Sequence, residues 1–263
     1  MREVSTIAGD QKQRLKRTPC DSWSQAPSAM TFPAGRVDLW CVNLDEPAGA
    51  GAETKLLSAD EILRAGRFHF EKDRLHFGRC RSALRQVLAG YIQIPAAEVR
   101  FEYLTGGKPH LAAEQNPRSL QFNVSHSAGV ALIAVGSEHR LGVDIERIRG
   151  DVDTISLAER FFSLRERAGL QALPEHLRVP GFFACWTRKE AFLKATGDGF
   201  SFPLADFSVS TDPALQHSRL EEIQGNARTG EQWYFADVGV GGDYRATVAG
   251  DASFSIMNTY AWN

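Results

Sequence analysis

The stretch W-T-R-K-E-A-F-L-K-A-T-G-D-G, residues 186–199, reads as a helix that ends in a turn. Its first part has neither proline nor an internal glycine, and the glycines near its end can leave the helical region of φ/ψ space at little cost. Pro180 is expected to break the chain before this helix. Glu190 and Lys194 are four residues apart, so both project from one face. Alone, such a pair is typical of a surface ion pair on a half-buried helix.

A second short stretch, L-G-V-D-I-E at 141–146, carries two more carboxylates. Its apolar residues predict a strand, and the two-residue period of a strand places Asp144 and Glu146 on the same face. Two neighbouring carboxylates repel each other, and a hard cation such as Mg²⁺ or Mn²⁺ relieves that repulsion by binding their oxygens. The alternative is an edge strand that turns both carboxylates to solvent.

The composition is that of a globular protein: 263 residues, 43% apolar and 24% charged, with a formal net charge of −2. This charge balance argues against a partner that is bulk nucleic acid or a membrane surface. No apolar run is long enough for a transmembrane helix, and the first residues lack the apolar core of a signal peptide. We therefore expect a cytoplasmic protein.

The four cysteines show no zinc-binding spacing. Cys41 and Cys185 lie among apolar and aromatic residues, as buried free thiols do. This pattern favours reduced cysteines and a reducing compartment.

The chain divides into a tail and two halves of similar build. Residues 1–35 can bury little apolar surface, which predicts a flexible tail. From Arg36 onward an Arg-Phe pair, a helical segment, a long helix and a strand occur once in each half, beginning at Arg67 and at Arg160. This echo predicts an N-terminal lobe over 36–139 and a C-terminal lobe over 140–263 that contains the metal site.

Three features of the first lobe bear on its chemistry. Ser58-Ala-Asp-Glu61 has the pattern of a capping box and predicts a helix start. The dense Arg, Lys and His residues from 64 to 81 are either a solvated helix face or a landing site for phosphate. A strand is expected from Leu120, interrupted at Ser125-His126-Ser127, and His126 is either a structural histidine or a ligand contact.

Five motifs occur together in this order: G-K-P at 107–109, F-N-V-S-H-S at 122–127, G-V-D-I-E at 142–146, R-F-F-S at 160–163 and W-T-R-K-E-A-F-L-K at 186–194. In this combination the chain, from about residue 36 to 250, resembles the 4′-phosphopantetheinyl transferase superfamily, in its two-lobed Sfp-type form. The resemblance implies an α+β fold of two similar lobes related by a pseudo-twofold axis, each with a small, mainly antiparallel sheet packed on a long helix.

The resemblance also implies an activity and a set of catalytic residues. Members move the phosphopantetheine arm of coenzyme A to a serine of an apo carrier protein, in a Mg²⁺-dependent reaction that releases 3′,5′-ADP. Asp144, Glu146 and Glu190 correspond to the metal ligands. Lys194 corresponds to a residue that contacts the pyrophosphate, and Glu166 to a carboxylate that serves as general base.

The implied contacts to coenzyme A come from both lobes. Lys189 and Lys194 would lie at the pyrophosphate, Lys108 and Pro109 at the adenine, Ser125 and His126 at the nucleotide phosphates, and Arg64 and Arg67 at the 3′-phosphate. One position departs from the family pattern, because Glu61 stands where a lysine is common.

The implied partners are coenzyme A and an apo acyl or peptidyl carrier protein. Because carrier proteins are typically acidic, the basic residues Arg160, Arg165 and Arg167 are candidate contacts. The two-lobed build implies a monomer, and the pathway of the carrier is not encoded. Two other hypotheses remain: a family member that binds coenzyme A or a carrier without catalysis, and a metal-dependent nucleotide hydrolase.

Overall fold

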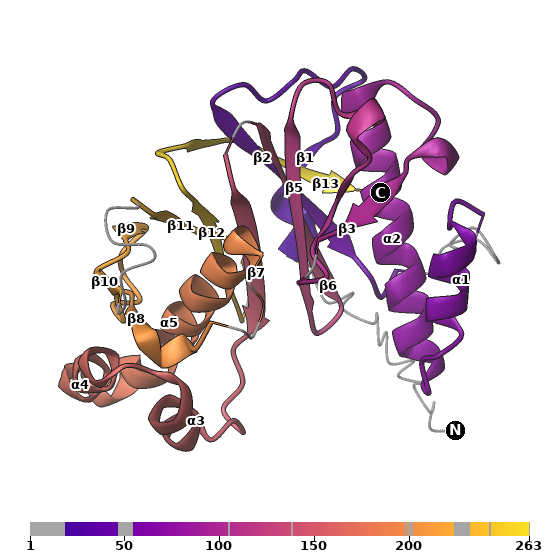
Figure 1. The fold of residues 1–263 in the computed structure, drawn as a ribbon. Coiled ribbons are helices and arrows are strands. Elements are labelled where there is room, and N and C mark those ends of the chain that lie inside the picture. Colours follow the sequence, from indigo (N-terminus) through magenta and orange to yellow (C-terminus); the bar gives the residue numbers. More distant parts are fainter. Residues whose placement is uncertain are drawn as a thin grey trace, which may run out of the picture.

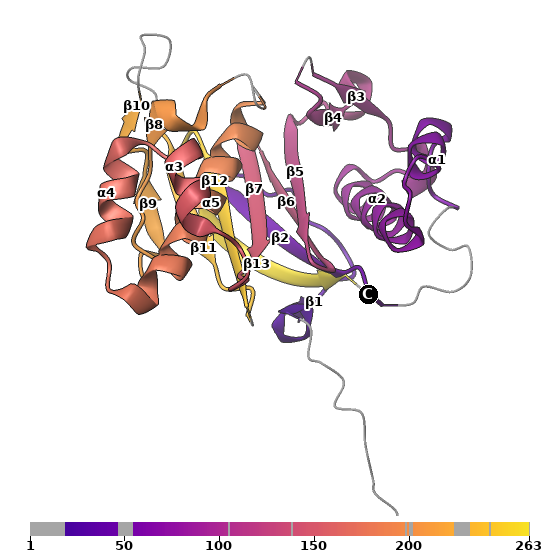
Figure 2. The same ribbon diagram turned by 90° about the horizontal axis from the view of Figure 1, so that it is seen from below.

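The computed structural model describes residues 19–46, 55–104, 106–137, 139–197, 199, 202–223, 232–241 and 243–262. Two β-sheets pack against each other, and a long helix covers the outer face of each (Figures 1 and 2). The first sheet has the strand order β1-β13-β2-β6-β5 and the second β7-β12-β11-β9. This arrangement gives four layers, helix, sheet, sheet and helix.

The strands of the first sheet are β1 (Ser24–Gln25), β2 (Arg36–Asn43), β5 (Leu120–Ser127), β6 (Val130–Ser137) and β13 (Ser255–Trp262). Those of the second are β7 (Leu141–Arg147), β9 (His217–Arg219), β11 (Tyr234–Val238) and β12 (Tyr244–Gly250). Two short pairs complete them: β3 (Phe101–Tyr103) with β4 (Pro109–Leu111), and β8 (Phe207–Ser208) with β10 (Glu222–Ile223). The helices are α1 (Ala59–Ala65), α2 (Glu71–Ile92), α3 (Thr154–Phe161), α4 (Leu164–Ala172) and α5 (Glu175–Thr196).

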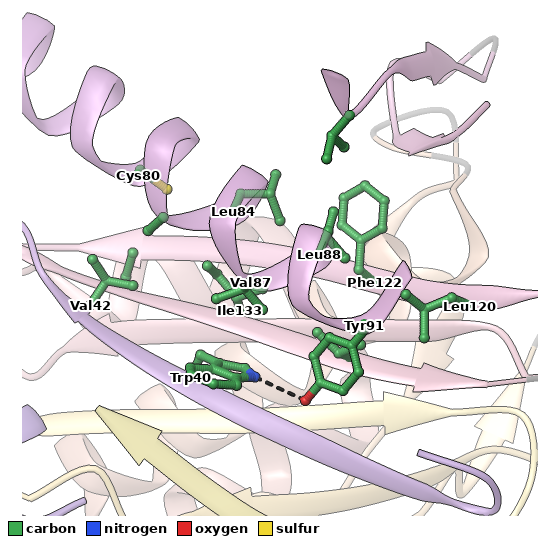
Figure 3. Packing of buried hydrophobic residues seen from close by; sticks show 14 of the residues in the cluster. Trp40, Val42, Cys80, Leu84, Val87, Leu88, Tyr91, Leu120, Phe122 and Ile133 are labelled. Atoms are coloured by element: carbon green, nitrogen blue, oxygen red, sulfur yellow. Dashed lines mark hydrogen bonds between the residues drawn. The ribbon is translucent and has the colours of Figure 1, made fainter. Parts of the chain in front are cut away.

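The apolar run of β6 explains how the layers hold together. Ala131, Ile133 and Val135 face α2, whereas Val130, Leu132 and Ala134 pack toward the second sheet. A strand buried on both faces reads as a continuous apolar run, as this one does. On the α2 side, Trp40 Nε1 donates to Tyr91 Oη at 3.2 Å inside this core (Figure 3).

The mixed α/β composition with small sheets agrees with the predicted fold class. The second sheet is antiparallel, but β13 runs parallel to both β1 and β2 in the first. The last strand of the chain therefore belongs to the sheet of the N-terminal half. The predicted pseudo-twofold relation between the halves stays a prediction.

Residues 19–35 correct the prediction of a flexible tail. Cys20 forms a disulfide with Cys41 of β2, Trp23 is buried, and β1 pairs with β13. The expectation that Cys41 is a free thiol was therefore wrong, because the fold brings a cysteine from outside the sheet against it. Cys80 and Cys185 are free and buried. The part of the predicted tail before residue 19 lies outside the described residues.

Two predicted interruptions are absent. Strand β5 continues through Ser125, His126 and Ser127, and helix α5 begins at Glu175 and includes Pro180. Pro180 lies in the second turn of α5, where only one intrahelical bond is lost, and the buried face that follows it holds the helix in place. No helix of the described ranges is long and apolar enough to cross a membrane.

Helix α5 lies against β7 at an unusually close approach, which Gly142 permits. A Cβ atom at residue 142 would lie 2.1 Å from the carbonyl oxygen of Ala191 and 2.5 Å from the amide nitrogen of Ala195. Only glycine fits between these backbones. The glycine of the G-V-D-I-E motif therefore allows the end of α5 to reach the strand that carries Asp144.

Candidate active site

Asp144 and Lys194 meet where the two sheets adjoin. Lys194 Nζ donates to Asp144 Oδ1 at 2.6 Å and to Ser125 Oγ at 2.7 Å, and Ser125 Oγ donates to the same Asp144 oxygen at 2.9 Å. Asp144 is buried, and its second oxygen, Oδ2, has no hydrogen-bond partner within the described part of the chain. Strand β7, strand β5 and helix α5 thus each contribute one side chain to a single polar contact.

Glu146 and Glu190 complete a group of three carboxylates. Burial raises the pKa of all three carboxyl groups. The charge of Asp144 raises the pKa of Glu146 further. The charges of Asp144 and Glu146 do the same for Glu190. These mutual effects place the three groups within electrostatic reach of one another. Burial is the largest cause of all three raised pKa values, and the neighbouring carboxylates add to it at Glu146 and Glu190.

The donor set suits a hard cation, and the orphaned Asp144 Oδ2 gives it a buried oxygen free to bind. In the present arrangement, however, no three His, Cys, Asp or Glu side chains of the described residues are grouped so that they could hold a metal ion. The ammonium of Lys194 lies on the other Asp144 oxygen instead.

A cavity of about 300 Å³ opens beside this group. It is lined by the turn between β3 and β4, by β5 and by the end of α5, and its lining residues include Lys108, Pro109, Asn123, Glu190 and Lys194. Both halves of the chain therefore contribute to it, as expected from the sequence. A cavity between two halves of a chain is a common place for a ligand.

Lys108 joins the two halves at this cavity. Its Nζ donates to the carbonyl of Leu141 at 2.8 Å and to the carbonyl of Ala195 at 3.0 Å. Burial, with the positive charge of Arg140, lowers the pKa of Lys108 to about 8. In this arrangement the lysine binds protein carbonyls, while Pro109 beside it lines the cavity.

His126 lies between Ser125 and Ser127 in β5 and lines neither cavity. Partial burial of the imidazole lowers the pKa of His126, and the positive charges of Lys194 and His76 lower it further.

Arg64 and Arg67 lie in a different cavity. This second cavity, of about 570 Å³, is lined by both arginines with Asp60, Leu63, Phe68 and Tyr103. Glu61 of α1, where the family pattern favours a lysine, is buried and forms ion pairs with Arg81 and Arg85 of α2. It therefore anchors α1 and does not face a ligand.

Glu166 and Lys189 are not at the site, which corrects both sequence-based roles. Lys189 Nζ donates to the two carboxylate oxygens of Glu166 at 2.6 and 2.7 Å and to the carbonyl of Phe207 at 2.6 Å, and both side chains are fully buried. Neither residue lines either cavity. The pair ties α4 to α5, and burial leaves Glu166 no route to a substrate proton.

Sequence reasoning missed two residues at the site. Asn123 lines the first cavity, and Ser127 Oγ donates to Glu146 Oε2 at 2.8 Å. The alternation Asn123, Ser125, Ser127 was the available signal, since alternate residues of a strand share a face.

Two family models match consecutive parts of the chain. The model described as "4'-phosphopantetheinyl transferase, N-terminal" matches residues 49–138, and the model of the 4′-phosphopantetheinyl transferase superfamily matches residues 140–249. The two matches together cover β5 and β6 of the first sheet and nearly all of the second sheet.

Curated relatives carry the same description. The 4′-phosphopantetheinyl transferase HetI of a Nostoc species is 39% identical over 193 residues, covering 73% of this chain and 81% of HetI. A 4′-phosphopantetheinyl transferase of Bacillus subtilis is 32% identical, over 65% of this chain and 75% of the relative. The L-aminoadipate-semialdehyde dehydrogenase-phosphopantetheinyl transferase of Xenopus laevis is 29% identical, over 60% and 55%. On the motifs, the site and these matches, the chain belongs to the 4′-phosphopantetheinyl transferase superfamily.

Proposed function

We propose that this protein transfers the 4′-phosphopantetheine arm of coenzyme A to a serine of an apo carrier protein, with Mg²⁺ and with release of 3′,5′-ADP. The observation that carries the proposal is the Asp144–Lys194 ion pair, with Glu146 and Glu190 in electrostatic reach of it, beside a cavity lined by both halves of one chain. Because a single chain supplies all of these groups, we propose a monomeric enzyme.

Asp144, Glu146 and Glu190 would hold the metal ion. When bound, Mg²⁺ would neutralise charge on the pyrophosphate oxygens and favour attack at the β-phosphorus. The free Asp144 Oδ2 and the raised pKa values of the three carboxyl groups support this assignment. Lys194 would keep a positive charge at the leaving side of the reacting bond.

Glu190 also replaces Glu166 as our candidate for the general base, with one carboxylate oxygen for the metal ion and the other for the substrate proton. It lies at the cavity wall and is only half-buried, so a substrate hydroxyl has access to it. Lys108, Pro109 and His126 remain the proposed contacts for the nucleotide, whereas the Ser125 hydroxyl is already engaged by Asp144 and Lys194.

The test is incubation of the protein with coenzyme A, Mg²⁺ and a panel of apo carrier proteins, followed by intact-mass spectrometry. The proposal expects a mass gain of one phosphopantetheine on at least one carrier. Binding of coenzyme A with no modified carrier would identify a binding module instead. Release of nucleotide with no modified carrier would identify a hydrolase.

Mg²⁺ is expected to raise the melting temperature at about pH 7.5 and to do so less at about pH 5.5. The folded-state pKa of each of the three carboxyl groups is raised, so the folded protein binds protons at a higher pH than the unfolded chain does. As the pH falls, these protons compete with the cation. Scanning fluorimetry with and without Mg²⁺ measures the effect, and an equal shift at both pH values would contradict it.

The surface at α3 and α4 is our proposed contact for the carrier protein. Ile155 and Leu164 expose 73% and 77% of their surface there, beside Arg160 and Arg165. Exposed apolar side chains next to arginines fit an acidic partner that also buries apolar groups.

Arg160→Glu is expected to raise KM for the carrier by about 10-fold and to leave KM for coenzyme A unchanged, because a like charge now faces the acidic carrier. Steady-state kinetics with each substrate varied in turn provides the measurement. Arg100→Glu is the matched control, since Arg100 is an exposed arginine of the N-terminal half. If the two variants have the same KM for the carrier, the α3–α4 surface is not the contact.

A further inference from the structure

Strands β5 and β7 lie side by side at the junction of the two sheets, yet they belong to different sheets. Side chains of β5 take the place of a backbone ladder between them. Asn123 Oδ1 accepts from the amide of Val143 at 2.8 Å, Ser125 Oγ from Ile145 at 3.4 Å and Ser127 Oγ from Arg147 at 3.2 Å. Each of these three β5 residues is two positions from the next, so all three face β7. We call Asn123, Ser125 and Ser127 the side-chain ladder.

The two serines of the ladder also hold the carboxylates. Ser125 Oγ donates to Asp144 Oδ1 at 2.9 Å, and Ser127 Oγ donates to Glu146 Oε2 at 2.8 Å. A hydroxyl has one donor and two acceptor positions. Ser125 uses all three, since it also accepts from Lys194 at 2.7 Å. Its hydroxyl therefore has a fixed orientation and no remaining capacity for a phosphate contact in this arrangement.

One oxygen of Asp144 and one of Glu146 are thereby held in place. The Asp144 oxygen that the ladder does not hold is the buried and unpartnered Oδ2. The backbone contacts and the carboxylate contacts come from the same hydroxyls, so the spacing between the halves and the direction of the carboxylates are set together.

We propose that the side-chain ladder positions Asp144 and Glu146 for metal binding while joining the two halves of the cavity, an inference that rests on the proposed function. Ser125 and Ser127 act through the carboxylates and are positioning residues. Hydrogen bonds to metal ligands typically change metal affinity by about 10- to 100-fold when they are removed.

Ser127 is the better residue for a test, because its hydroxyl contacts Glu146 and the amide of Arg147, and it does not line the cavity. Ser127→Ala is expected to weaken binding of Mn²⁺, measured by calorimetry without coenzyme A or carrier, by about 10-fold. Ser127→Thr keeps the hydroxyl on a residue that strands accept and should restore most of the affinity.

Ser137→Ala is the matched control. Ser137 is also buried in the first sheet, but its hydroxyl donates to the carbonyl of Pro33 at 3.0 Å. The Ser137→Ala variant should lose about as much thermal stability as Ser127→Ala does, and it should keep the Mn²⁺ affinity of the unsubstituted protein. Unchanged Mn²⁺ affinity in Ser127→Ala, equal loss in the control, or no Mn²⁺ binding by the unsubstituted protein would overturn the proposal. Failure of the proposed function is a separate result, namely that the unsubstituted protein modifies no carrier.

Discussion

Asp144→Asn is expected to lower the rate of phosphopantetheine transfer by about 10³-fold. The asparagine has nearly the same shape, and its Oδ1 can still accept from Lys194 and Ser125, so the surrounding geometry is kept. It removes the charge from the most buried of the three carboxylates, where a cation would gain most from it. Intact-mass spectrometry of the carrier over time measures the rate.

The same substitution should not destabilise the fold. Burial raises the pKa of Asp144, so its ionised form is less stable in the folded protein than in the unfolded chain, and at neutral pH the loss of this charge removes an unfavourable contribution. We expect a melting temperature equal to or above that of the unsubstituted protein. Asp243→Asn, at an exposed position of the neighbouring β11–β12 turn, is the control and should change neither quantity. Transfer at the full rate in Asp144→Asn would remove Asp144 from the proposed ligands.

Gly142→Ala is expected to destabilise the protein by about 3 kcal/mol and to reduce transfer in the fraction that folds. The added Cβ would lie 2.1 Å from one backbone atom of α5 and 2.5 Å from another, and a backbone cannot move aside as a flexible side chain can. Helix α5 must therefore shift away from β7, and Glu190 and Lys194 shift with it. Chemical denaturation gives the change in the free energy of unfolding.

Gly239→Ala provides the comparison, because a Cβ there meets nothing within 4 Å and the residue needs no left-handed backbone. Any cost that comes from glycine replacement in general appears in both variants. If Gly142→Ala is as stable as Gly239→Ala, the close approach of α5 and β7 does not constrain the sequence.

Local patterns were read correctly from the sequence. The capping box at Ser58–Glu61 is present in the structure, since it depends on residues that are close in the chain. Family resemblance supplied what local pattern could not, namely the hypothesis that Asp144, Glu146 and Glu190 act together. The resemblance did not reveal the Glu166–Lys189 pair, because a motif records residue types and not which side chains become enclosed.

The errors share one physical cause, which is contact between residues distant in the chain. Ser125 and Ser127 looked like an interruption because the strand that satisfies them, β7, follows only after another strand. Cys41 looked like a free thiol because its partner Cys20 lies in a segment with little apolar content. In both cases tertiary structure decided between alternatives that the sequence left equal.

The position of β13 between β1 and β2 has a consequence for biosynthesis. Until residues 255–262 have left the ribosome, the edge of β2 that later pairs with β13 is open, and this edge includes Leu39 and Trp40. Strand β1 likewise lacks β13, the strand with which it pairs. The first sheet therefore begins to form before the second but is completed only when β13 has been synthesised. Until then the apolar edge of β2 stays exposed. Slow translation of the segment between β2 and β13 would lengthen the time for which this edge is exposed and increase the demand for a chaperone.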